Sequence, residues 1–164
     1  NTVTGIASAY MDSVPIVVLS GQVPKALIGN DAFQEVDIVG ITRPCTKHNY
    51  LVMSIDELAS TVKEAFHLAR SGRPGPILVD IPKDITKETA EYSPGKAVKL
   101  KSYNPTYNPN MKQLKKIVPL IENTERPMIF AGGGVILSKA SHELTELACT
   151  ALTGPIWAPR PATC

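Results

Sequence analysis

The chain has 164 residues, of which 43% are hydrophobic and 20% are charged, and its net charge is +2. This length and composition are typical of a globular protein with an apolar core, folded as one ordinary domain or as parts of two. No basic run is interleaved with aromatic residues, and the longest apolar runs are about five residues long. These features argue against a nucleic-acid partner and against a membrane.

In chain order, the first predicted element is a short helix over residues 1–11, where small and apolar residues recur at roughly helical spacing. The apolar run Ile16–Leu19 then predicts a strand that is buried on both faces and stops at Ser20. A polar loop follows, in which Asp31 is the expected N-cap of a short helix. Ligands bind at the carboxyl ends of strands in open α/β sheets, so this loop is where we expect a site.

The middle of the first half reads as strand, helix and strand. A strand is predicted near Lys47–Val52, and a capping box of Ser54 and Glu57 opens an amphipathic helix that ends at Gly72. A second doubly buried strand is predicted at Ile77–Ile81. The expected buried stripe of the helix consists of Leu58, Val62, Ala65, Phe66 and Ala69.

Two further features of this region concern metal binding and domain organisation. Cys45 and His48 have the spacing of half a zinc site, but no second pair of ligands accompanies them, so we expect no metal. Residues 86–110 are rich in proline and polar residues and show no period of 2 or 3.6. This composition predicts an extended interdomain linker.

The second half begins with a predicted helix over residues 111–122, in which Pro119 is expected to kink or cut the last turn. A strand over residues 127–131 should run into three glycines and a helix over residues 138–152, which is how a nucleotide-binding α/β unit begins. The residues from Pro155 to Cys164 read as irregular.

The three glycines of this unit are Gly132, Gly133 and Gly134. They do not complete a dinucleotide fingerprint, because the third glycine should stand at position 137, which is Leu. The local pattern leaves two interpretations open, a structural turn or a close approach to a ligand.

The stretch IVVLSGQVPKALIGNDAFQE, at Ile16–Glu35, resembles the pyrimidine-binding domain of the acetohydroxyacid synthases (acetolactate synthases), which are thiamine-diphosphate enzymes. The phrases NTVTGIASAYMDSVP, GITRPCTKHNYLV and SGRPGPILVDIPKDI support the resemblance, which is close up to Asp84 and looser to about Thr153. It implies an internal portion of the large, catalytic subunit with a parallel α/β fold. Residues 1–85 would be the C-terminal half of the pyrimidine-binding domain, 86–110 a linker, and 111–164 the start of a Rossmann-like central domain.

The resemblance also implies roles for residues around the polar loop. Gln34 would be an active-site amide near the thiamine cofactor and the substrate, with Phe33 beside it, and Asn1 would also lie beside the cofactor. The substrate channel would be lined by Pro24, Ala32 and Lys83. From the residues alone, Asn1 reads as a terminal polar residue or a helix cap, and Gln34 as a solvated surface amide.

A flavin is implied as well. In the resembling family, the position of Arg73 and the loop of Gly132, Gly133 and Gly134 contact FAD. The residue itself also allows a simpler interpretation, in which Arg73 is a surface guanidinium at a helix C-terminus, where the helix dipole favours a cation.

The activity implied is the condensation of two pyruvates, or of pyruvate and 2-oxobutyrate, with loss of carbon dioxide. The products are 2-acetolactate or 2-aceto-2-hydroxybutyrate, in branched-chain amino-acid biosynthesis. Thiamine diphosphate, Mg²⁺ and FAD are the implied cofactors. The glutamate that activates thiamine and the Mg²⁺ motif lie outside this chain, so the isolated chain is predicted to be inactive.

The implied partners are a 2-keto acid substrate, identical catalytic subunits in a homodimer or tetramer, and a small regulatory subunit. The implied location is the cytoplasm in a bacterium, and the plastid or mitochondrion in a eukaryote. Two alternatives stay open. One is another thiamine-diphosphate carboligase or oxidase, such as a glyoxylate carboligase or a pyruvate oxidase, and the other is a non-catalytic nucleotide-binding module.

Overall fold

The structure, a computed structural model, describes residues 1–92, 97–98, 100–125 and 127–151. The predicted irregular stretch Pro155–Cys164 lies outside these ranges. The chain forms two compact units, Asn1–Tyr107 and Asn108–Cys164. None of the helices in the described ranges combines the length and the hydropathy that a membrane crossing needs.

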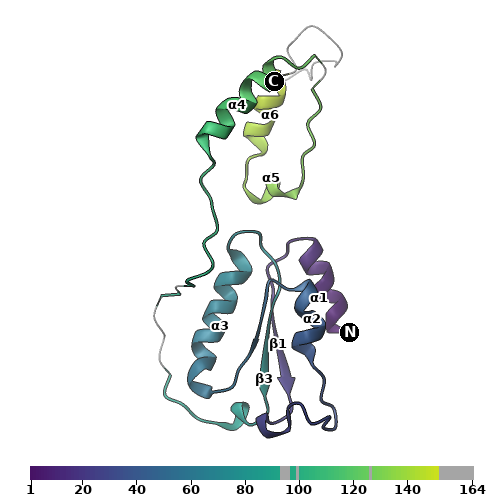
Figure 1. Ribbon diagram of the computed structural model, residues 1–164, viewed down its shortest axis with the longest axis vertical. Coiled ribbons are helices and arrows are strands. Elements are labelled where there is room, and N and C mark those ends of the chain that lie inside the picture. The colour runs from purple at the N-terminus through teal and green to yellow at the C-terminus, as the bar shows by residue number, and fades with distance from the viewer. Residues whose placement is uncertain (93–96, 99, 126, 152–164) are drawn as a thin grey trace. The chain divides into compact units, whose positions relative to one another are not determined.

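The first unit is built on a three-stranded parallel sheet. Its strands are β1 (Val17–Gln22), β2 (His48–Leu51) and β3 (Ile77–Pro82), in the order β1-β3-β2 (Figure 1). The first residues of β1 and β2 both pair with Ile77, so all three strands start at the same edge. For the first unit, the predicted α/β class with a parallel sheet is confirmed.

Helices cover both faces of this sheet. α3 (Ile55–Arg70) lies on one face, and α1 (Thr2–Met11) and α2 (Ile38–Thr42) lie on the other (Figure 1). Short 3₁₀ turns occur at Lys25–Leu27, Arg43–Cys45 and Ile85–Lys87.

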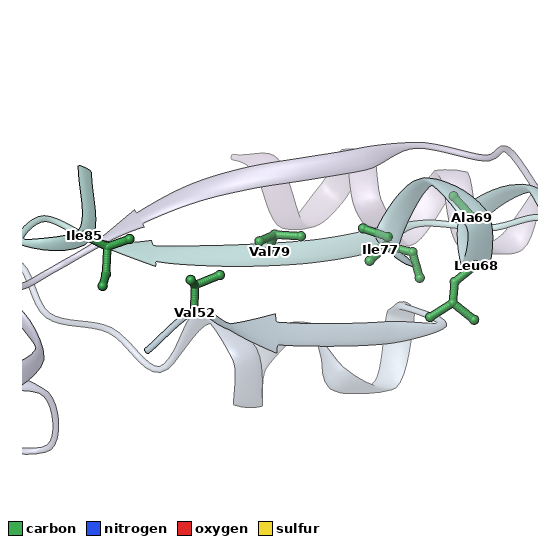
Figure 2. Close-up of a cluster of buried hydrophobic side chains, with 7 residues drawn as sticks. Val52, Leu68, Ala69, Ile77, Val79 and Ile85 are labelled. Atoms are coloured by element: carbon green, nitrogen blue, oxygen red, sulfur yellow. The ribbon is translucent and has the colours of Figure 1, made fainter. Parts of the chain in front are cut away.

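The core lies between β3 and α3. Ile77, Leu78 and Val79 are fully buried, which confirms the prediction that this strand is covered on both faces. Figure 2 shows the cluster that β3 forms with side chains from α3 and from the ends of β2 and β3. The cluster consists of Val52, Ala65, Leu68, Ala69, Ile77, Val79 and Ile85.

β1 differs from its prediction in two ways. It continues through Ser20 to Gln22, and it is not buried on both faces, since the Leu19 side chain is 59% exposed. The reason is topological. β3 takes the central position, so within the described residues β1 pairs on one side only, and an apolar run does not reveal which strand is central.

α3 begins and ends as predicted. The Ser54 side chain caps it by accepting a hydrogen bond from the Asp56 amide at 3.3 Å, and the chain leaves it through Gly72 at φ +57°. The predicted buried stripe of α3 is wrong at one position, because Phe66 is 56% exposed and Leu68 is buried instead. Leu68 lies three residues after the fully buried Ala65 and so shares its face, whereas Phe66 is turned away by about 100°.

The predicted helix at Asp31 does not form. Asp31 adopts a left-handed conformation at φ +52°, and the next helix, α2, begins only at Ile38. Its N-cap is Asp37, whose side chain accepts a hydrogen bond from the Gly40 amide at 2.8 Å. Both aspartates have suitable side chains, and only the backbone path selects between them.

The second unit contains three helices in its described part: α4 (Met111–Glu122), α5 (Gly133–Leu137) and α6 (Ser141–Ala151). α4 has the predicted bounds and continues for three residues beyond Pro119, so of the two expected effects, a kink or a cut of the last turn, the cut does not occur. Asn110 caps its start by accepting from two backbone amides.

The predicted strand over residues 127–131 is absent from the described part of the second unit. Met128 and Phe130 are 92% and 98% exposed, and no described strand pairs with them. A strand needs a partner for its backbone hydrogen bonds, which an apolar run does not supply. The predicted helix over residues 138–152 is also wrong in its start, since α5 uses the glycines as its first turn and α6 begins at Ser141.

Candidate functional site

The candidate site is the carboxyl edge of the sheet, where the long loop after β1 meets the turn after β3. The two strands end in register, with Gln22 opposite Pro82. The Lys83 amide donates to the Gln22 carbonyl oxygen at 3.0 Å, so the two exits start side by side. The loop from Val23 to Asp37 therefore lies where open α/β sheets bind ligands.

The tip of this loop is held by its own glutamate. The Glu35 carboxylate accepts hydrogen bonds from the amides of Gly29 and, at 2.9 Å, Ala32. Chiefly because of the Gly29 bond, with Ala32 second, the pKa of Glu35 is lowered from its ordinary value. Asp31 and Gln34 take left-handed conformations in this tip, at φ +52° and +63°, each costing about 1–2 kcal/mol. The carboxylate thus supports a backbone path that is unfavourable by itself.

The start of the loop is tied to the segment after β3. The Lys25 amide donates to Asp84 Oδ1 at 3.2 Å, and the Lys25 ammonium lies 3.7 Å from Asp84 Oδ2 and 3.3 Å from Glu88 Oε1. Desolvation acts to raise the pKa of Asp84, but the amide of Lys25, further backbone amides and the Lys25 charge together lower it. Because these ion pairs are exposed to solvent, which screens them, they contribute little to the stability of the fold.

Side chains at the base of the loop bind a buried carboxyl group. Asp80, in the middle strand, is 1% exposed, and its oxygens accept from Ser20 Oγ at 2.6 Å and from Gln22 Nε2 at 3.0 Å. The same Gln22 nitrogen donates to the Val36 carbonyl oxygen at 3.0 Å, and Gln22 Oε1 accepts from the Val23 amide at 2.9 Å.

Sequence reasoning missed this network. The available signal was the single carboxyl group of Asp80 within an otherwise apolar strand, Ile77–Pro82, because a buried polar group must find partners.

The structure brings five of the predicted site residues to this one edge. Pro24 precedes the first 3₁₀ turn of the loop, and Lys83 leaves the end of β3. At the loop tip, Ala32 is half-buried, Gln34 is exposed and Phe33 is 89% exposed. The exposed aromatic ring and amide are available to a ligand, or to another part of the protein.

Asn1 lies at the start of α1, which runs antiparallel to β1 (Figure 1). The N-terminal end of α1, with Asn1, is therefore directed toward the carboxyl edge of the sheet. The Asn1 side chain makes no capping hydrogen bond, so the simple reading of Asn1 as a side-chain cap is not observed.

Arg73 lies at the opposite edge of the sheet, before the start of β3. Its Nε donates to Ser13 Oγ at 2.8 Å, and its Nη2 lies 3.4 Å from the Tyr10 carbonyl oxygen and 3.3 Å from that of Met11. The guanidinium also stands over the Tyr10 ring, 5.9 Å from its centroid. Arg73 therefore does interact with a helix C-terminus, but with that of α1 and not with that of α3, which it follows in sequence.

The three glycines lie in the second unit, at the start of α5. Gly132 precedes this five-residue helix in an extended conformation, and Gly133 and Gly134 form its first turn. A Cβ added at any of the three would meet nothing within 4 Å. The backbone is thus open to a ligand here, although nothing in the packing of the described residues requires glycine.

No group of three His, Cys, Asp or Glu side chains in the described ranges is arranged to hold a metal ion. Cys45 and His48 have other contacts. The Cys45 sulfur donates to the Thr42 carbonyl oxygen at 3.4 Å, and the His48 ring packs edge-on against Tyr50 at 4.6 Å between centroids.

Comparison with known proteins gives one family and a set of close relatives. Residues 1–41 match the family described as thiamine pyrophosphate enzyme, N-terminal TPP binding domain. The chain is 50% identical over 147 residues to the acetolactate synthase large subunit of Buchnera aphidicola subsp. Schizaphis graminum, covering 88% of this chain and 26% of that protein. The identity is 48% over 149 residues to the acetolactate synthase of Arthrospira platensis, covering 90% of this chain and 26% of that protein.

A third relative is the acetolactate synthase large subunit of Cyanidium caldarium, 43% identical over 152 residues, with 90% of this chain and 26% of that protein covered. The chain is therefore similar, over about nine tenths of its length, to proteins of this name, and it spans about a quarter of their length.

Proposed function

We propose that the protein to which this sequence belongs is a thiamine-diphosphate-dependent acetolactate synthase. The observation that carries the proposal is the identity of 43–50% to acetolactate synthases over about nine tenths of the chain. The thiamine-enzyme family match over residues 1–41 agrees with it. These names favour the synthase over a glyoxylate carboligase, a pyruvate oxidase or a separate nucleotide-binding module.

Within such a synthase, we assign residues 1–85 to the C-terminal half of the pyrimidine-binding domain, 86–110 to a linker and 111–164 to the beginning of a Rossmann-like central domain. The parallel sheet of the first unit supports the first assignment. The division between the two units falls after Tyr107, inside the proposed linker.

The amide and aromatic side chains of this chain suit a thiamine cofactor. When bound, thiamine diphosphate supplies the electron sink for decarboxylation, and the protein supplies placement and electrostatics. Gln34 and Asn1 would hold its polar ring, because an amide donates and accepts without carrying charge. Phe33, which is 89% exposed, would cover an apolar part of the cofactor or substrate. We assign no Mg²⁺ ligand to this chain.

For FAD, we propose contacts at Arg73 and at Gly132, Gly133 and Gly134. The exposed Arg73 guanidinium and the open backbone at the glycines support this assignment. Arg73 already uses Nε and Nη2 within the protein, so only its remaining N–H groups are free to serve a flavin.

The substrates we propose are pyruvate and a second 2-keto acid, in a channel lined by Pro24, Ala32 and Lys83. The products are 2-acetolactate or 2-aceto-2-hydroxybutyrate, for branched-chain amino-acid biosynthesis. We further propose a homodimer or tetramer of catalytic subunits with a small regulatory subunit. The location we propose is the cytoplasm in a bacterium, or the plastid or mitochondrion in a eukaryote.

The test is acetolactate formation from pyruvate by the full-length protein, with and without the substitution Gln34→Glu. This change replaces the amide donor with a carboxylate beside an anionic substrate, so kcat/KM should fall roughly 10- to 100-fold. Gln113→Glu, the same change on an exposed position of α4, should leave activity within about twofold of wild type.

The 164-residue chain alone is expected to form no acetolactate. The proposal fails if the full-length wild-type protein makes no acetolactate from pyruvate, or if the isolated chain makes it as fast as the full-length protein.

A further inference from the structure

The buried carboxyl group of Asp80 has no role in the function proposed above. It is 1% exposed and lies in the central strand, where an unpartnered polar group is costly. One of its oxygens accepts from Ser20 and the other from Gln22. Both donors belong to β1, so the carboxyl fixes side chains of the strand from which the site loop leaves.

Gln22 uses every part of its side-chain amide. Its Nε2 donates to Asp80 at 3.0 Å and to the Val36 carbonyl oxygen at 3.0 Å, and its Oε1 accepts from the Val23 amide at 2.9 Å. Val23 is the first residue of the loop, and Val36 stands just after its tip. One side chain, oriented by a buried carboxyl group, therefore joins the two ends of the loop.

The loop between Val23 and Val36 needs a contact that holds its two ends together. Asp31 and Gln34 are both left-handed, a conformation that non-glycine residues keep only where the surroundings enforce it. Glu35 supports the tip from inside, by accepting from Gly29 and Ala32. That contact does not fix the tip relative to the sheet, whereas the contact of Gln22 with Val36 does.

We propose that Gln22, held by Asp80, is a positioning residue that closes the loop 23–36 on the sheet and so sets where Phe33 and Gln34 stand. The effect of Gln22 on activity rests on the function proposed above. The closure of the loop by Gln22 is independent of that function.

The experiment uses the full-length protein and the substitution Gln22→Met, which keeps the length of the side chain and removes its three hydrogen bonds. The control is Ser20→Ala, which removes a hydrogen bond from the same carboxyl group without touching the loop. The measurements are amide hydrogen exchange of loop peptides, the thermal midpoint, and kcat and KM for pyruvate.

We expect Gln22→Met to speed exchange of the loop roughly tenfold and to lower kcat/KM roughly tenfold, since its three side-chain hydrogen bonds are lost. Ser20→Ala loses a single hydrogen bond, so it should leave loop exchange and kcat/KM within about twofold of wild type and lower the thermal midpoint less than Gln22→Met does. A merely structural role would lower the midpoint of Gln22→Met and leave its loop exchange and kcat/KM at the values of the Ser20→Ala control.

If Gln22→Met does not fold, Gln22→Asn replaces it. Its amide is one carbon shorter, so it cannot reach both Asp80 and Val36, and we expect the same direction of change. Loop exchange and kcat/KM within twofold of the Ser20→Ala control would overturn the proposal. If the wild-type protein makes no acetolactate, the proposed function fails, and loop exchange still decides whether Gln22 closes the loop.

Discussion

Removal of the Arg73 guanidinium should weaken the C-terminal end of α1 by an amount that follows from its contacts. Arg73→Met keeps the aliphatic stem and removes the guanidinium, with its bond to Ser13 and its contacts to the carbonyl oxygens of Tyr10 and Met11. Each of the three exposed hydrogen bonds contributes about 0.5 kcal/mol to the stability of this helix end. The cation at the helix end contributes about 0.3–1 kcal/mol, which partly overlaps with the hydrogen bonds. The helix end should therefore lose about 1.5–2 kcal/mol of stability in Arg73→Met.

This loss should be local, because the contacts all lie at the end of α1. The amides of Asp12 and Val14 bond back to Ser8 and Ala9 at 3.0 and 2.8 Å, so they report opening of that end. About 1.4 kcal/mol corresponds to a tenfold change in an opening equilibrium, so their hydrogen exchange should quicken at least about tenfold.

The assay compares hydrogen exchange and bound flavin in the full-length protein for wild type, Arg73→Met and Arg70→Met. Arg70 carries the same side chain in the last turn of α3 and is exposed, so it controls for loss of a cation. Exchange at Asp12 and Val14 within twofold of that control would refute the helix-end role of Arg73. A loss of flavin without faster exchange would make Arg73 a flavin contact alone.

Two further predictions follow from the loop tip and from the end of α3. Since the pKa of Glu35 is lowered in the folded state, its stabilising effect is present above the ordinary value of 4.5 and is lost as the pH falls through the lowered value. Exchange of the loop 23–36, corrected for intrinsic rates, should therefore quicken in acid, and Glu35→Gln should remove this pH dependence; an unchanged acid response in Glu35→Gln would contradict the assignment. Gly72→Ala should lower the stability of the first unit by at least about 1 kcal/mol, because φ is +57° and the new Cβ would stand 2.7 Å from the Tyr103 hydroxyl. Gly5→Ala in α1, with nothing within 4 Å, is its control in thermal unfolding, and equal midpoints would contradict this prediction.

Elements whose signals are local could be predicted from the amino-acid sequence alone. Ser54 and Gly72 bound α3 correctly, because a cap and a left-handed stop act on neighbouring backbone groups. The apolar run at Ile77–Ile81 correctly indicated a strand at that place, which is β3. The loop after β1 was likewise identified as the candidate site from the order of its strand and its polar residues.

Features that depend on partners distant in sequence could be seen only in the folded chain. It placed β3 in the centre and β1 beside it, joined Asp80 to Gln22 across 58 residues, and turned Arg73 toward α1. It also left residues 127–131 without a strand, although they are as apolar as β1. The physical reason is common to these cases. Strand pairing, burial of a carboxyl group and contacts between side chains distant in sequence depend on which backbone segments lie side by side. A local sequence pattern carries no information about that.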